Sequence, residues 1–85
     1  MNKKAKFRSS SEWKKKRKEI MKRDNFKCKL CGKKEGLQCH HVHSLDVNWE
    51  MRLDNNNIIT VCKDCHSNIH NNKYSEYYLL QQISK

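Results

Sequence analysis

The chain has 85 residues, a formal net charge of +10 and a hydrophobic content of only 35%. This length allows one domain whose core is too small to be stable alone, so a metal, disulfides or a partner must supplement it. No apolar run approaches the roughly 20 residues that cross a bilayer, and the charged N-terminus lacks the apolar stretch of a signal peptide, so we expect a cytoplasmic protein rather than a membrane or exported one.

The positive charge is concentrated at the front of the chain. Residues 1–34 contain 15 Lys and Arg against 3 Asp and Glu, whereas residues 35–85 contain 4 against 6. Residues 1–8 are polar and basic, which predicts a disordered tail. A charge excess of this size favours nucleic acid as the partner.

The first predicted element is a basic helix from Ser10 to about Arg23. Ser9 and the glutamate three residues later fit a capping box, and Trp13, Ile20 and Met21 fall on one side of the helix. The other sides carry Lys and Arg, which we interpret as phosphate contacts rather than as a merely solvated face. The candidate nucleic-acid-binding residues are Lys14, Lys15, Lys16, Arg17, Lys18, Lys22 and Arg23.

Short strands and helices follow the basic helix. β-Branched and apolar residues predict strands at 37–42 and 57–61, and helices are predicted at His66 to about Asn71 and at 74–83, the second capped by Ser75. We divide the chain into a basic tail (1–8), one domain (9–72) and a C-terminal tail or short helix (73–85).

Two Cys-x-x-Cys pairs, Cys28/Cys31 and Cys62/Cys65, are the first chemical signal. Each pair lets one turn present two thiolates to one ion, and two such turns complete the tetrahedron that zinc prefers. We therefore predict a structural zinc site that contributes folding free energy, in preference to four ordinary buried or free thiols. The fifth cysteine, Cys39, is interpreted as a small core residue, with a spare metal ligand as the alternative.

The stretch Cys62-Lys-Asp-Cys65-His66 also matches the Cys-x-x-Cys-His signature of haem attachment. Haem attachment usually needs export, for which the sequence shows no signal peptide, and it would leave the Cys28/Cys31 pair unexplained. We therefore favour zinc over haem.

The histidines are the second chemical signal. His66 and His70 lie four residues apart, so one face of a helix can present both to one ion. His40 and His41 are adjacent on a predicted strand and point to opposite sides, so one can complete a metal site while the other faces a substrate. The alternative is that these four are surface or core histidines of a plain zinc module. His43 is interpreted as solvent-exposed, with a phosphate contact as its alternative.

In these residues the chain resembles the HNH endonuclease family, also described as the ββα-metal nucleases. The matching pattern is His40-His41-Val42, Asn57-Ile58-Ile59 and Cys62-x-x-Cys65-His66-x-x-x-His70, with Trp13, Arg23-Asp24 and Cys28-x-x-Cys31-Gly32 upstream. The resemblance covers roughly residues 12–70. Within the family, the chain most resembles the small members with a structural zinc site that are common in bacteriophages and mobile elements. It implies a small α+β protein with the ββα-metal (HNH, His-Me finger) fold, stapled by a four-cysteine zinc site and preceded by a basic helix.

The resemblance also implies a role for each site residue. His41 would be the general base, and Asn57 would orient it. His40, His66 and His70 would be the protein ligands of a catalytic divalent metal, so that His66 belongs to both the catalytic and the metal-binding set.

The chemistry of phosphodiester hydrolysis agrees with these roles. A neutral imidazole can take a proton from water at neutral pH, and one divalent cation can stabilise the scissile phosphate and the leaving 3′ oxygen. We therefore expect a metal-dependent endonuclease that nicks or cuts DNA, with structural Zn²⁺ and a catalytic Mg²⁺, Mn²⁺, Ni²⁺ or Zn²⁺.

Two other functions remain open at this point. One is a non-catalytic four-cysteine zinc module that binds DNA. The other is a nuclease accessory of a phage packaging complex, with terminase or another packaging protein as its partner. Whichever function holds, the nuclease included, we expect a monomer or a weak dimer.

Overall fold

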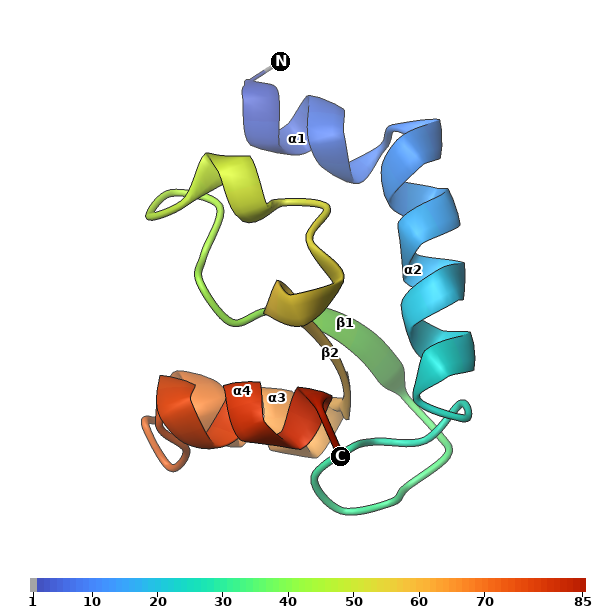
Figure 1. The fold of residues 1–85 in the computed structure, drawn as a ribbon, viewed down its shortest axis with the longest axis vertical. Helices are drawn as coiled ribbons and strands as arrows, with labels where there is room; N and C mark the ends of the chain where they lie inside the picture. The colour runs from blue at the N-terminus through green and yellow to red at the C-terminus, as the bar shows by residue number, and fades with distance from the viewer. Residues whose placement is uncertain (1) are drawn as a thin grey trace.

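The computed structural model describes residues 2–85, and Met1 lies outside the described part. The elements in order are α1 (Lys3–Arg8), α2 (Ser11–Arg23), β1 (Leu37–His41), β2 (Ile58–Cys62), α3 (Lys63–His70) and α4 (Glu76–Ile83), with 3₁₀ turns at Trp49–Met51 and Asn55–Asn57. Figure 1 shows the strands at the centre, α1 and α2 bordering them above and to the right, and α3 and α4 together at the lower left. The protein is a small α+β fold, as the sequence predicted. No helix within residues 2–85 is both long and apolar enough to cross a bilayer.

The register of the sheet decides where the adjacent histidines point. β1 and β2 pair antiparallel, with His41 opposite Ile58 and His40 opposite Ile59. Successive residues of a strand face opposite sides of the sheet. Ile58 packs on the side of α2, in the cluster that contains Trp13, whereas Ile59 packs on the side of α3 and α4. The register therefore sends His41 toward α2 and His40 toward α3.

β2 is buried along its whole length because both faces of the sheet are covered. Leu79 of α4 and Val61 belong to the core on one face, and Trp13 and Ile20 of α2 belong to the core on the other. The two clusters hold few side chains, so a chain of this size needs additional restraints to be stable.

Residues 3–8 form α1, whereas their charge predicted a disordered tail. The side chain of Asn2 caps α1 by accepting a hydrogen bond from the N–H of Ala5 at 2.8 Å. Phe7 is buried against Trp13 and Trp49, with ring centroids 5.2 and 5.7 Å apart. The prediction of disorder is therefore wrong for the described residues of the tail, because a single aromatic residue docks the segment on a distant loop.

α2 and the two strands lie within one residue of their predicted bounds. The N-cap of α2 is Ser10, whose hydroxyl accepts from the N–H of Trp13 at 3.1 Å. Ser9, which was expected to form a capping box, instead ends α1. The presence of α1 thus changes the role of this serine.

α3 begins at Lys63, three residues before the predicted start at His66. The side chain of Cys62 caps it, because its sulfur accepts from the N–H of Cys65 at 3.4 Å. The second Cys-x-x-Cys pair is therefore also the first turn of α3. α4 begins directly after its cap, Ser75, as the sequence predicted.

Candidate active site and metal clusters

Four cysteine sulfurs meet between the loop after α2, the end of β2 and the start of α3. The Sγ atoms of Cys28, Cys31, Cys62 and Cys65 all lie within 4.8 Å of one another, and those of Cys31 and Cys62 are 3.6 Å apart. Cys31 is exposed, and the other three are buried. The structure thus brings together all four residues of the two predicted knuckles.

The first knuckle is a tight backbone turn. The N–H of Cys28 donates to the carbonyl of Lys33 at 2.8 Å, and the N–H of Gly32 donates to the carbonyl of Cys28 at 2.8 Å. Gly32 has a φ of +82°, which favours glycine over residues with a Cβ. The N–H of Lys29 donates to the carbonyl of Thr60 at 3.0 Å, which attaches the knuckle to β2.

Four clustered sulfurs cannot all carry negative charge unless a cation is bound. Burial raises the pKa of Cys28, but hydrogen bonds from neighbouring backbone groups, chiefly those of Cys62 and Cys31, outweigh burial and lower this pKa to about 7. Burial and the neighbouring thiols raise the pKa of Cys65. A soft divalent cation with tetrahedral coordination, such as zinc, fits this donor set.

A second cluster consists of His40 from β1 and His66 and His70 from α3. Each offers one ring nitrogen, and these nitrogens lie within 4.8 Å of one another. The Nε2 atoms of His66 and His70 are 3.2 Å apart, and the rings of His40 and His66 meet edge to face at 5.1 Å. Burial, assisted by the two neighbouring imidazoles, lowers the pKa of His40 to about 4. Three imidazoles that leave coordination positions open fit a divalent metal that also binds water or substrate oxygens.

Gln38 determines which nitrogen of His66 faces this cluster. Its Oε1 accepts a hydrogen bond from Nδ1 of His66, so Nε2 keeps the lone pair that faces His70. Hydrogen bonds of this kind orient histidine ligands and make them more basic. Gln38 was not predicted from the sequence. Its position two residues before His40 places it on the same face of the strand, which could have indicated that it lies beside the histidine cluster.

His41 lies on the other face of β1, apart from the three-histidine cluster. Its Nε2–H donates to the carbonyl oxygen of Arg52 at 2.8 Å, which leaves Nδ1 as the unprotonated nitrogen. Trp13 stacks on the imidazole at 4.7 Å, and Phe7 lies 5.9 Å from it. Burial lowers the pKa of His41, although the hydrogen bond to Arg52 acts in the opposite direction. The ring is thus neutral at neutral pH and has one free nitrogen.

Asn57 organises the loop that carries the acceptor of His41. Its side chain is fully buried. Its Oδ1 accepts from the N–H of His43 at 2.7 Å, and its Nδ2 donates to the carbonyls of His43 and Met51 at 3.1 and 3.3 Å. Met51 directly precedes Arg52 in the sequence. By binding the Met51 carbonyl, Asn57 therefore also positions the Arg52 carbonyl that accepts the hydrogen bond from His41.

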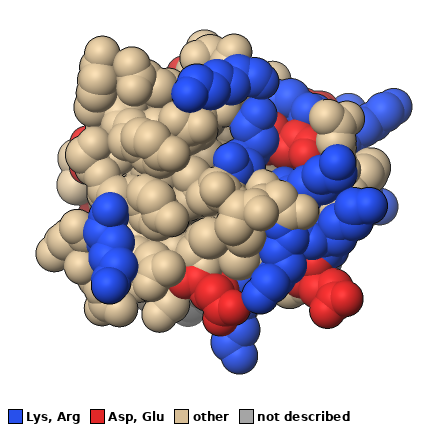
Figure 2. Space-filling model, turned by 90° about the horizontal axis from the view of Figure 1, so that it is seen from below, with Lys and Arg blue, Asp and Glu red and all other residues tan. Residues whose placement is uncertain are grey.

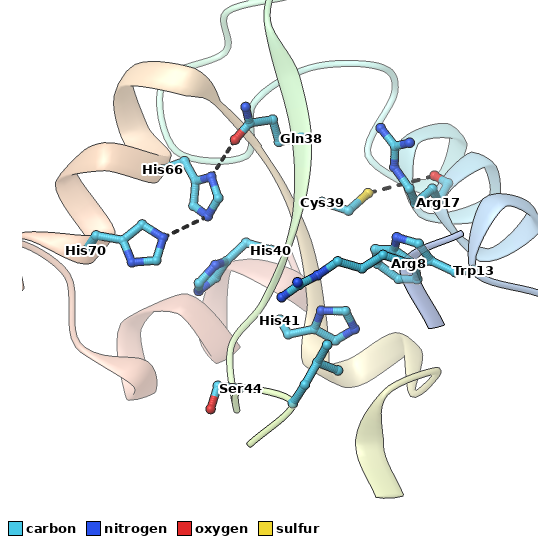
Figure 3. Close-up of a pocket in the computed structure, with 11 residues that line it drawn as sticks. Arg8, Trp13, Arg17, Gln38, Cys39, His40, His41, Ser44, His66 and His70 are labelled. Atoms are coloured by element: carbon cyan, nitrogen blue, oxygen red, sulfur yellow. Dashed lines mark hydrogen bonds between the residues drawn. The ribbon is translucent and has the colours of Figure 1, made fainter. Parts of the chain in front are cut away.

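His41 and the three histidines of the cluster line the same cleft, which has a volume of about 530 Å³. Within residues 2–85, β1 pairs only with β2, so its other edge is free. The cleft is lined by residues from both faces of β1 and therefore lies along this free edge. Figure 3 shows His66 and His70 on one side of this strand, and Arg8, Trp13 and Arg17 on the other. The complete lining is Arg8, Trp13, Arg17, Gln38, Cys39, His40, His41, Ser44, Leu45, His66 and His70. Sequence reasoning missed Arg8 because it assigned residues 1–8 to a disordered tail.

The predicted DNA-binding residues lie on α2. Figure 2 shows Lys and Arg gathered on the right-hand side of the molecule, where Figure 1 places α2. Two of these residues are engaged within the protein. Lys16 binds the side chains of Glu19 and Asn55 at 3.0 and 2.7 Å. The remaining predicted residues on the exposed surface of α2 are Lys14, Lys15, Arg17, Lys18 and Lys22.

Arg23 is the second engaged residue, and its guanidinium makes hydrogen bonds with three other residues. It donates to both carboxylate oxygens of Asp24 at 2.8 Å, and to the carbonyls of Asn55 and Ile58 at 2.7 Å. Asp24 in turn accepts from the N–H of Thr60 at 3.1 Å. Arg23 therefore joins the end of α2 to β2. The sequence did not predict this structural role, because Arg23 is one of many basic residues in this helix.

The sequence allowed two interpretations each for Cys39 and His43. Cys39 packs against the core on the α2 side, and its sulfur lies 3.9 Å from the carbonyl of Arg17. It is not among the four clustered cysteines, which agrees with its interpretation as a core residue. His43 is half-buried, and its Nδ1 lies 3.3 Å from a carboxylate oxygen of Glu76.

Comparisons with known proteins match the part of the sequence that contains these site residues. The sequence model of the HNH endonuclease family matches residues 28–72, which contain all four clustered cysteines and every histidine of the cleft. The COX1/OXI3 intron 2 protein of Saccharomyces cerevisiae is 34% identical over 58 residues, which cover 56% of this chain and 7% of that protein. No solved structure matches the chain. None of these comparisons bears on the expected bacteriophage origin or on a packaging partner.

Proposed function

Because the chain belongs to the HNH endonuclease family, we propose that it is a metal-dependent endonuclease that hydrolyses the phosphodiester bonds of DNA. One observation carries this proposal. A single cleft contains a three-histidine cluster and, separately, His41 with a free Nδ1 whose orientation is fixed by the carbonyl of Arg52. A module that only bound DNA through a zinc-stapled scaffold would have no use for this pair of features.

Each metal has its own set of residues. His40, His66 and His70 would hold the catalytic cation, and the four clustered cysteines would hold a structural Zn²⁺. When bound, the catalytic cation supplies Lewis-acid stabilisation to the phosphate and to the leaving 3′ oxygen. Mg²⁺, Mn²⁺, Ni²⁺ and Zn²⁺ are the candidates, and a three-imidazole donor set favours the transition metals by affinity.

His41 acts as the general base. Its Nδ1 accepts a proton from a water molecule while the oxygen of that water bonds to phosphorus. The bond between phosphorus and the 3′ oxygen breaks, and the 3′ oxygen takes a proton from solvent. The carbonyl of Arg52 stabilises the imidazolium that forms, because it already accepts from Nε2–H. Trp13 covers one face of the ring and keeps it in this orientation.

The remaining residues position the base and the substrate. Asn57 holds the loop that presents the Arg52 carbonyl, and the exposed lysines of α2 contact phosphates of the DNA backbone. Such contacts supply affinity without sequence information, and they weaken as the salt concentration rises. We therefore propose an enzyme with little sequence specificity of its own.

The test is an incubation of supercoiled plasmid with the zinc-loaded protein and each candidate divalent cation. We expect nicked or linear product that depends on the added cation, and far less of it with His41→Ala. His43→Ala is the matched control, because His43 neighbours the site in sequence but does not line the cleft. If the wild-type protein binds DNA but cleaves it with none of these cations, the protein is a binding module and the proposed function is wrong.

A further inference from the structure

The four arginines of the chain divide into two pairs. Arg23 donates to Asp24 and to two backbone carbonyls, and Arg52 donates to the carbonyl of Trp49 and lies over its ring at 4.8 Å. Arg8 and Arg17 are exposed, and within residues 2–85 neither pairs with a carboxylate. Two arginines therefore maintain the fold, and two have free guanidinium groups.

Both free guanidinium groups belong to residues that line the cleft. In Figure 3 they extend from α1 and α2, on the side of β1 opposite His66 and His70, and the Arg8 side chain reaches toward the strand beside His41. None of the residues described as lining the cleft is an Asp or Glu. Two unpaired guanidinium groups in a cleft that contains histidines, and no described carboxylate, favour an anionic ligand.

The helix that carries Arg8 is fixed in place. Its neighbour Phe7 is 7% exposed and packs on Trp13, the residue that also stacks on His41. Lys4, one turn earlier, pairs with Asp46 of the loop after β1 at 2.9 Å. Arg8 is thus anchored to the same aromatic group as the proposed base, which is the kind of support that keeps a substrate-binding group in a defined position.

We propose that Arg8, assisted by Arg17, binds the phosphodiester of the DNA substrate from the side of the cleft opposite His40, His66 and His70. Arg8 contacts the non-bridging oxygens of the reacting phosphate, and Arg17 contacts the adjoining backbone. Negative charge builds up on the non-bridging oxygens as the water attacks, so a guanidinium there stabilises the transition state more than the bound substrate. The contact also extends the active site to α1, outside residues 28–72 that match the family.

This inference rests on the proposed function for its reaction, but the phosphate contact can be tested without cleavage. The first experiment titrates the zinc-loaded protein, freed of other divalent cations, with a thymidine dinucleoside monophosphate and follows the Nε–Hε signals of all arginines by NMR. We expect the signals of Arg8 and Arg17 to shift, and those of Arg23 and Arg52 to stay. If Arg8 does not respond while other groups do, the proposal is wrong.

The second experiment compares single-turnover cleavage by Arg8→Gln, Arg8→Lys and Lys6→Gln. Lys6 is an exposed cation on the same helix that does not line the cleft, so its variant removes an equal charge. We expect Arg8→Gln to cleave on the order of 100-fold more slowly than wild type, Arg8→Lys to recover part of this loss, and both glutamine variants to bind DNA equally well. Equal cleavage rates for Arg8→Gln and Lys6→Gln would overturn the proposal.

The two experiments also separate this inference from the proposed function. If the Arg8 and Arg17 signals shift but the wild-type protein never cleaves, the phosphate contact is supported and the nuclease assignment fails. If the wild-type protein cleaves and Arg8→Gln cleaves as Lys6→Gln does, the nuclease assignment is retained and the contact is rejected. Zinc content and the amide spectrum of each variant exclude loss of folding as the cause.

Discussion

Substitution of Asn57 by alanine should destabilise the protein by about 3 kcal/mol. The buried amide makes three hydrogen bonds, to the N–H and carbonyl of His43 and to the carbonyl of Met51. Each contributes about 1 kcal/mol net, and truncation leaves their partners unsatisfied in a half-buried loop. Because domains of this kind are stable by only about 5–15 kcal/mol, the loss is large but does not by itself unfold the protein.

The assay is urea unfolding of the zinc-loaded protein, followed by the fluorescence of its two tryptophans. Asn56→Ala is the matched control, because Asn56 neighbours Asn57 but is exposed. A difference between the two variants of less than about 0.5 kcal/mol, within the range of ordinary surface substitutions, would refute the reasoning. Under conditions where Asn57→Ala remains folded, we also expect slower cleavage, because the Arg52 carbonyl that orients His41 is no longer held.

Four further predictions follow from the same structure. Removal of zinc by a chelator should unfold the protein, because the two small core clusters lack other restraints, and circular dichroism that stays unchanged on complete removal would contradict this. Gln38→Ala should weaken binding of Ni²⁺ or Mn²⁺ to the histidine cluster roughly 10-fold or more, because His66 loses its orienting acceptor, and calorimetry that gives the wild-type affinity would disprove that role. Arg23→Ala should cost more than 2 kcal/mol in urea unfolding, and Lys22→Ala should cost almost nothing, because only Arg23 makes hydrogen bonds to Asp24 and the backbone near β2. Thr60→Val should leave stability unchanged or raise it by up to about 1 kcal/mol, because the Thr60 hydroxyl is buried and has no partner among the described residues, and a clear loss of stability would show that a partner exists.

The parts of the site that the sequence predicted are those determined by local spacing. Two residues between cysteines and three between His66 and His70 dictate which side chains share a turn or a helix face, whatever the rest of the chain does. Alternation along a strand likewise separates His40 from His41. These relations join residues at most four positions apart in the sequence, and the structure places the corresponding side chains as expected.

The parts that the sequence did not predict depend on contacts between distant segments. Residues 3–8 have the composition of a disordered tail, and contacts with distant segments, such as the packing of Phe7 on Trp49 more than 40 positions away, hold them as a helix. The position of Arg8 in the cleft follows from that contact. Arg23 looked like one more cation of a basic face because its acceptors, such as the Ile58 carbonyl, belong to a strand 35 positions further on.

The most direct test of the central claim is the single-turnover cleavage rate of His41→Ala, at saturating DNA and divalent cation, against wild type and His43→Ala. If His41 removes the proton of the attacking water, the His41→Ala rate should fall by about 100-fold or more, while His43→Ala stays close to wild type and all three proteins keep their zinc and their DNA affinity. Cleavage by His41→Ala at the rate of His43→Ala would contradict the account.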